Sequence, residues 1–221
     1  EFGRVVAGLI RATRDFELAE ESVQDAFLIA LERWPVEGIP PNPGGWITTT
    51  ARNRAIDRLR RAKRLVDKTE ILGRTQLIEE ELAAAEPGEG KDEMPIQDDR
   101  LRLIFTCCHP ALSVDARVAL TLRTLGGLQT PEIARAFLVP EVTLAQRLVG
   151  AKRKIRDAGI PYRVPQDHLL PERLDSVLQV IYLVFNEGYS ASSGEAVTRR
   201  DLSSEAIRLG RLLAELVYRG G

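Results

Sequence analysis

The segment at 128–156 constrains the fold most, because its residues have the pattern of two short helices joined by a tight turn. Thr130 is a good N-cap, Pro131 suits the first helical position, and Glu132 favours the positive end of the helix dipole. The turn falls at 138–140. Apolar residues recur with helical spacing on both sides of it: Ile133, Ala134 and Phe137, then Leu144, Leu148, Ala151 and Ile155.

The second helix of this pair carries a polar and basic face opposite its apolar one. That face consists of Thr143, Gln146, Arg147, Lys152, Arg153 and Arg156. A helix-turn-helix places such a helix in the major groove of duplex DNA, with N-terminal residues at base edges and basic residues on phosphates. The alternative is an ordinary helical hairpin with a solvated basic face. A second basic element elsewhere in the chain favours the DNA interpretation.

Charge is segregated along the chain, although the formal net charge is only −1. The stretch at 52–64 is strongly basic, as is the one at 147–156, and the segment at 79–99 between them is strongly acidic. This pattern predicts two anion-binding modules on a tether. The acidic segment is expected to be a solvated tether; the alternative is that it shields the basic faces in the free protein.

Nearly all periodic segments have helical spacing, so we predict an all-α protein. Breaker-rich stretches at 35–45, 86–95 and 159–165 separate the helical parts. Helices are expected at 3–14, 17–34, 44–64, 68–83, 97–107, 113–125, 130–138, 141–157, 171–186 and 200–218. The predicted parts are a helical domain at 1–65, an acidic linker at 66–98, a helix-turn-helix domain at 99–158 and a C-terminal helical extension at 159–221.

Several classes of protein are disfavoured by the composition. No apolar run approaches the ~20 residues that span a bilayer, and no signal peptide is visible, so a cytoplasmic protein is expected. Cys107 and Cys108 are adjacent and are the only cysteines, which argues against a disulfide. With His109 beside them and His168 remote, the ligands for a zinc site are lacking, so both cysteines are predicted to pack in a core and no cofactor is expected.

The first helical part contains two amphipathic stretches. In the first, the apolar stripe consists of Ala19, Val23, Ala26, Phe27, Ala30, Leu31 and Trp34. The opposite, polar face consists of Glu20, Glu21, Gln24, Asp25 and Glu32. In the second, at 46–61, Ile56 and Leu59 are expected to face a core, and the outward set is Arg52, Asn53, Arg60 and Lys63. Such a helix offers cations to phosphates and an amide to a base edge. Trp46 either fills the core, which we favour, or stacks on an unpaired base.

At this point the residues resemble a known family. Residues 19–27 are similar to the polymerase-binding helix in region 2 of the bacterial sigma-70 family, and residues 46–60 to the promoter −10 recognition helix that follows it. The helix-turn-helix at 130–156 resembles region 4, which reads the −35 element. Two such domains joined by a linker resemble the extracytoplasmic-function (ECF) class. The resemblance covers about residues 1–158.

The resemblance implies roles for individual residues and partners. The β′ clamp of core RNA polymerase would be bound by Glu20, Glu21, Gln24 and Asp25, with the β flap as a second polymerase contact. The −10 element would be bound by Trp46, Arg52, Asn53, Arg60 and Arg61, with the loop at 34–45 holding a flipped base. At the −35 element, base edges would be contacted by Thr143, Gln146 and Arg147, and phosphates by Lys152, Arg153 and Arg156. No catalytic residue is implied.

The C-terminal part at 173–209 resembles a subgroup with a helical extension, which usually continues into tetratricopeptide-like repeats. In that subgroup the extension is thought to regulate activity in place of an anti-sigma partner. Two alternatives stay open from the residues alone. One is a stand-alone helix-turn-helix regulator, and the other is an interaction scaffold that binds a peptide through Tyr182, Phe185 and Tyr189. An enzyme is disfavoured, because the sequence shows no set of nucleophile, base and orienting group.

Overall fold

The structure is a computed structural model that describes residues 2–65, 78, 93–190, 203–204, 206–211 and 213–215, with the side chains of these except 63–65, 93–98 and 187–190. Within those ranges the regular structure is helical and no strand occurs, which confirms the all-α prediction. The chain divides into two compact units, residues 1–96 (unit 1) and 97–221 (unit 2). The helix expected at 68–83 lies outside the described residues apart from Ile78.

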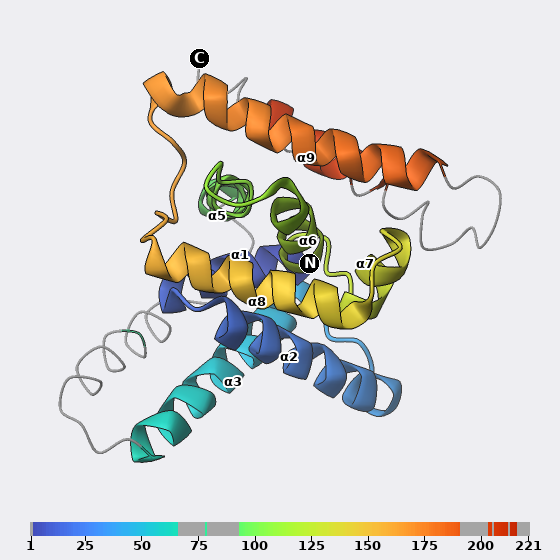
Figure 1. Cartoon of the computed structure of the whole chain (residues 1–221). Helices are drawn as coiled ribbons and strands as arrows, with labels where there is room; N and C mark the ends of the chain where they lie inside the picture. Colours follow the sequence, from blue (N-terminus) through green and yellow to red (C-terminus); the bar gives the residue numbers. More distant parts are fainter. Residues whose placement is uncertain are drawn as a thin grey trace. The chain divides into compact units, whose positions relative to one another are not determined.

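Unit 1 is built on three helices: α1 (Phe2–Thr13), α2 (Phe16–Glu37) and α3 (Pro43–Leu65). α2 packs on both of the others, and α2 and α3 run back along each other from a short loop at 38–42 (Figure 1). Their apolar faces enclose one core, to which the largest contributions come from Val6, Ile10, Phe16, Val23 and Ile47. The packing of three amphipathic helices thus orients the outer faces of α2 and α3.

Side-chain caps begin both long helices of unit 1. The Asp15 carboxylate accepts hydrogen bonds from the backbone N–H groups of Glu17 (2.9 Å) and Leu18 (3.0 Å), and the Asn42 side-chain oxygen accepts one from Gly45 N–H (2.9 Å). The expected loop at 35–45 is wrong at both ends. α2 continues through Pro35 to Glu37, because a proline in the last turn removes only one hydrogen bond, and Gly38 N–H closes that turn on the Trp34 carbonyl (3.0 Å). Pro43 begins α3 because its fixed φ suits a first helical position.

Two residues of α2 do not lie on the faces predicted for them. Leu31 was expected in the apolar stripe and is 73% exposed, because the buried row ends at Ala30 and the next residue lies about 100° further round the helix. Glu20 was expected on the outer face and is only 4% exposed. Ser22, two residues further on and so almost on the opposite side of the helix, is buried as well, since α1 and α3 together enclose the N-terminal half of α2 more widely than a single stripe.

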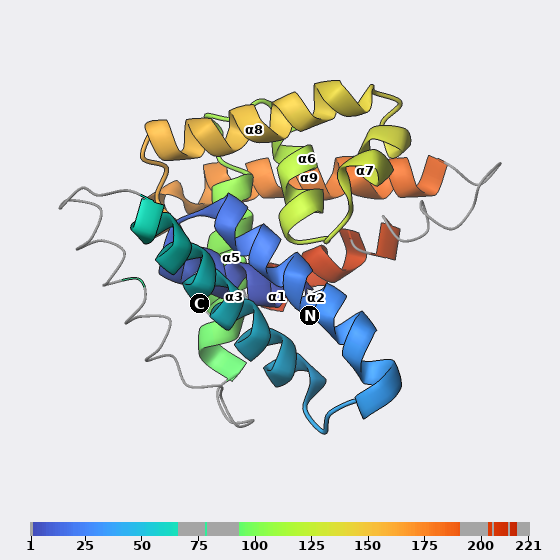
Figure 2. The ribbon, with the colours of Figure 1, turned by 90° about the horizontal axis from the view of Figure 1, so that it is seen from below.

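Unit 2 begins within α5 (Glu93–Cys107). It also contains α6 (Val114–Thr124), α7 (Thr130–Ala136), α8 (Glu141–Asp157), the short 3-10 helix η1 (Asp167–Leu169) and α9 (Leu170–Ser190). α5 begins earlier than the expected start at 97, because Pro95 is tolerated in a first helical turn. α6, α7 and α8 pack on one another as a three-helix group (Figures 1 and 2). The buried row of α8 is the predicted one: Leu144, Leu148, Ala151 and Ile155.

The predicted helix pair is confirmed, with a correction to its first cap. The N-cap of α7 is Gln129 and not Thr130, because the Glu132 carboxylate accepts a hydrogen bond from Gln129 N–H (2.6 Å) and closes a capping box one residue earlier. The turn between α7 and α8 places Leu138 in the left-handed region, with φ +51°. Pro140 then precedes the first residue of α8.

The C-terminal extension packs within unit 2. One face of α9 is buried through Val177, Val180 and Val184, and α9 lies against α6. The helical residues at 203–215 bury Ala206, Leu209 and Leu213. Three arginines add hydrogen bonds between the extension and the rest of the unit: Arg173 to the Phe105 carbonyl, Arg208 to the Leu125 carbonyl (3.3 Å), and Arg117 to the Gln179 side chain (3.5 Å). The extension therefore completes the core that the helix-turn-helix shares.

Both cysteines are buried at the C-terminal end of α5, which confirms that they pack in a core. Their sulfur atoms lie 3.3 Å and 3.5 Å from the hydroxyls of Thr124 and Thr121 on α6. Burial raises the pKa of Cys108 to about 11. In the described part of the chain, no three His, Cys, Asp or Glu side chains gather where a metal ion could bind. None of the described helices combines the length and hydropathy that a bilayer crossing requires.

We expect both thiols to be unreactive in the folded protein. At pH 8 an aromatic disulfide reagent should label neither cysteine within an hour, and it should label both in denaturant, because only an exposed thiolate attacks. The raised folded-state pKa stabilises the protonated form. The free energy of unfolding of unit 2 should therefore be highest below the pKa of the unfolded thiol, ~8.5. It should fall as the pH rises from there toward 11, the folded-state pKa of Cys108, because the unfolded chain loses this proton first. Rapid labelling of the native chain at pH 8 would contradict the packing described above.

Candidate nucleic-acid interface

One face of α3 brings together an aromatic ring, an amide and a guanidinium. Trp46, Asn53 and Arg60 follow one another at seven-residue intervals, so they lie in one row along the helix. Asn53 and Arg60 are exposed and Trp46 is half-buried. The row has a ring at one end, a hydrogen-bonding group in the middle and a cation at the other end, and each member lies about 10 Å along the helix axis from the next, at 1.5 Å per residue.

Other cations predicted for this face are placed differently. Arg61 and Arg52 lie about 100° round the helix from the row, on opposite sides of it, and Arg61 is exposed whereas Arg52 is half-buried. Burial, and after it the nearby Arg11 guanidinium, lower the pKa of Arg52. The side chain of Lys63 lies outside the described residues. Arg52 is consequently less accessible than Asn53, Arg60 and Arg61.

Trp46 belongs partly to the core and partly to the surface. Its ring meets that of Trp34 edge to face, with centroids 5.5 Å apart and planes at 64°. This geometry suits the quadrupoles of two aromatic rings and fixes the Trp46 ring at the start of α3. Because Trp46 is only half-buried, part of the residue remains accessible at the head of the row.

The acidic residues of α2 are linked to α3 through one arginine. Arg58 pairs with Asp25 (2.9 Å) and with Glu21. The hydrogen bond that Arg58 donates to Asp25, together with the charges of both carboxylates, raises the pKa of Arg58. Of the four residues predicted to bind polymerase, Glu21 and Asp25 are thus engaged within unit 1, Gln24 is half-buried and Glu20 is buried. The α2 surface is less acidic toward solvent than its sequence indicates.

Two leucines on α2 are exposed and were not predicted to be. Leu28 is 58% exposed and Leu31 is 73% exposed. With Gln24 they follow the spacing i, i+4, i+7, so the three residues form one row, which we name the α2 leucine face. Exposed apolar rows flanked by polar residues are typical of protein-binding surfaces. The sequence could have indicated this exposure, because Leu28 and Leu31 fall outside the helical row Ala19, Val23, Ala26 and Ala30, which is buried.

The outer face of α8 is opposite its buried row and consists of Val142, Gln146, Val149, Arg153 and Arg156. All five are exposed. Thr143 and Lys152 are half-buried at the two edges of this face. The structure therefore brings Gln146, Arg153 and Arg156 together as predicted, and it adds two valines that the sequence interpretation did not select.

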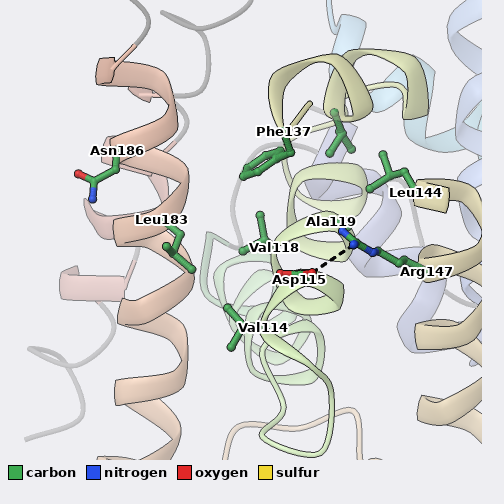
Figure 3. Close-up of a pocket in the computed structure, with 10 residues that line it drawn as sticks. Val114, Asp115, Val118, Ala119, Phe137, Leu144, Arg147, Leu183 and Asn186 are labelled. Carbon is green, nitrogen blue, oxygen red and sulfur yellow. Dashed lines mark ion pairs between the residues drawn. The ribbon is translucent and has the colours of Figure 1, made fainter. Parts of the chain in front are cut away.

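Arg147 turns away from this face toward α6. Its guanidinium forms an ion pair with Asp115 (3.3 Å) and its side chain is 34% exposed (Figure 3). The pair is partly open to solvent, so its contribution to stability is small. Its effect is positional, because it holds Arg147 on the side of α8 that faces the rest of unit 2.

A cavity of about 280 Å³ lies beside this ion pair. It is enclosed by α6, α7 and α8 on one side and by Leu183 and Asn186 of α9 on the other (Figure 3). Val118 and Phe137 supply its apolar walls. Its ionised groups are Asp115 and Arg147, already paired, and this set offers no nucleophile with a base.

Comparison with known proteins decides the family. Residues 2–65 match the family described as Sigma-70 region 2, and residues 102–155 match Sigma-70, region 4. The chain belongs to the sigma-70 family. Its two regions are arranged in the manner typical of ECF sigma factors, as the resemblance implied. Residues 173–220, which include most of α9, match a family of unknown function (DUF6596).

This sigma-70 chain is also similar to a longer curated protein. An uncharacterized protein of Rhizobium meliloti (strain 1021) is 42% identical over 215 residues, which cover 96% of this chain and 50% of that protein. The chain thus spans about half the length of the curated relative it matches. No solved structure matches the chain.

Proposed function

We propose that this chain is a promoter-specificity subunit that binds core RNA polymerase and directs transcription initiation at promoters with −10 and −35 elements. The observation that carries the proposal is that each sigma-70 region presents a row of side chains suited to DNA: half-buried Trp46 with exposed Asn53 and Arg60 on α3, and exposed Gln146, Arg153 and Arg156 on α8. Two independent rows in one chain favour binding to a composite DNA site with two elements. A stand-alone repressor would need only the helix-turn-helix.

In this proposal polymerase holds the two units at a fixed spacing. Each unit alone makes few contacts and binds weakly, and tethering raises the effective concentration of the second contact. Asn53 contacts a base edge of the −10 element, with Arg60 and Arg61 on phosphates and Trp46 at an unstacked base. Arg153, Arg156 and Lys152 neutralise phosphates at the −35 element. Polymerase binds the α2 leucine face, with Glu21 at its edge.

Transcription by the reconstituted holoenzyme tests the base-edge role. Promoter fragments are first selected from a random duplex library by the chain bound to bacterial core polymerase. Asn53→Ala should lower run-off transcription from the selected promoters at least tenfold, the effect of losing one good base contact. Arg33→Gln, an exposed charge change on α2 outside the proposed contacts, is the matched control and should have no effect. Equal activity of wild type and Asn53→Ala would remove Asn53 from the interface.

Salt dependence separates phosphate contacts from base contacts. Loss of one phosphate contact lowers the slope of log affinity against log salt concentration by about 0.9. We expect this change in slope for Arg153→Ala in holoenzyme binding to the selected duplexes. Asn53→Ala should weaken binding with the slope unchanged. An unchanged slope for Arg153→Ala would show that α8 does not place this arginine on a phosphate.

A further inference from the structure

The buried row of α8 fixes which residues of that helix meet a ligand. Because Leu144, Leu148, Ala151 and Ile155 face the core, the opposite side is set, and its N-terminal half consists of Val142, Gln146 and Val149 at i, i+4 and i+7. The two valines are 69% and 59% exposed. Gln146 therefore stands between two apolar side chains on the outermost part of the helix.

The residues that sequence spacing places beside Gln146 do not share this position. Thr143 lies at the edge of the face, and Arg147 is drawn toward Asp115 on α6. A DNA groove that receives the outer face of α8 thus meets valine before it meets Thr143 or Arg147. The two exposed valines therefore need a partner in the groove, and the proposed base and phosphate contacts give them none.

We propose that Val142 and Val149 contact the 5-methyl groups of two thymines in the major groove, on either side of the base pair that Gln146 contacts. The inference rests on the proposed function and names a part of the sequence that the −35 site must contain. The thymine methyl is the one apolar group that a base pair presents in the major groove, and small apolar side chains are its usual partners.

The spacing of the valines sets the spacing of the thymines. Seven residues at 1.5 Å per residue put the two side chains about 10 Å apart along the helix axis, which corresponds to about three base-pair steps of 3.4 Å. Ala145 and Gly150 flank the valines, and a Cβ built on Gly150 would meet nothing within 4 Å. These small neighbours allow close approach of the duplex, which short valine side chains require.

Deoxyuridine provides the test, because it pairs as thymine does and lacks only the methyl group. Duplexes selected by the reconstituted holoenzyme should contain two thymines about three base pairs apart in the upstream element. Replacing each in turn with deoxyuridine should weaken holoenzyme binding about fourfold, the effect of one buried methyl group. Val142→Ala should abolish the response to one replacement and Val149→Ala the response to the other. Leu138→Ala, an exposed apolar residue in the turn before α8, should abolish neither.

Each outcome decides the proposal. Loss of the deoxyuridine effect in the matching valine variant supports it, since both valines are exposed and their truncation does not disturb the core. Tight binding that is indifferent to deoxyuridine overturns the methyl contacts and leaves the proposed function standing. A deoxyuridine effect that neither valine variant alters assigns the contact to other residues. Failure of the holoenzyme to select any duplex counts against the proposed function itself.

Discussion

Replacing Val180 with Asp is expected to unfold unit 2 and to leave unit 1 folded. Val180 is fully buried on α9, between Val177 and Val184, and α9 lies against α6, the helix on which α7 and α8 pack. An unpaired carboxylate in an apolar core costs several kcal/mol, and a loss of about 4 kcal/mol or more is a large part of the stability of a domain this size. The extension is thus predicted to be a structural requirement of region 4.

The chain contains a separate native probe for each unit. Both tryptophans, Trp34 and Trp46, lie in unit 1, and both cysteines lie in unit 2. The Val180→Asp variant should expose both thiols to labelling at pH 8 with no change in tryptophan emission. Leu178→Asp, which puts the same charge on the exposed side of α9, is the matched control and should protect the thiols as the wild type does. Protected thiols in Val180→Asp would mean that region 4 folds without α9.

Replacing Leu31 with Asp is expected to weaken binding to core RNA polymerase at least thirtyfold. An interface residue whose loss costs about 2 kcal/mol changes the dissociation constant by about that factor, and the added charge opposes burial of the α2 leucine face. The side chain is 73% exposed, so the substitution leaves the core of unit 1 intact. Affinity is measured by titrating core polymerase with labelled chain.

The control for this effect uses another exposed apolar residue of the same helix. Val36 is 86% exposed and lies on a different side of α2 from Leu31. Val36→Asp should bind polymerase with nearly wild-type affinity. If the two variants bind equally well, the α2 leucine face is not the polymerase contact. If both variants lose affinity to the same extent, the loss is caused by a negative charge near the end of α2 and not by damage to this face.

Local pattern was sufficient to predict most helices. The row Leu144, Leu148, Ala151 and Ile155 is both the periodic row in the sequence and the buried row of α8, because a helix between a core and solvent needs one apolar stripe. The places where this reasoning was wrong are helix ends and α2. Pro35 was interpreted as a helix breaker, and the start of α7 depended on a capping box that Glu132 closes on Gln129.

The direction in which a site residue points depends on side chains of other helices, which spacing along one helix does not reveal. Arg147 has the spacing of a base-reading residue, but Asp115 on another helix holds it to one side. Arg58 pairs with Asp25 and Glu21 across two helices, which reduces the charge that α2 offers to a partner. Periodicity specifies which face is buried, whereas a salt bridge between helices follows from the tertiary arrangement.

Association with core RNA polymerase decides whether the chain acts as a promoter-specificity subunit. Purified chain and bacterial core polymerase are mixed, passed through a gel-filtration column, and the complex is assayed for run-off transcription on a selected promoter. We expect the chain to elute with the polymerase in equal amounts, and we expect transcripts to start at one position only when the chain is present. Elution of the chain on its own, at the volume of a 24.6 kDa protein and with no promoter-dependent transcript, would contradict this role.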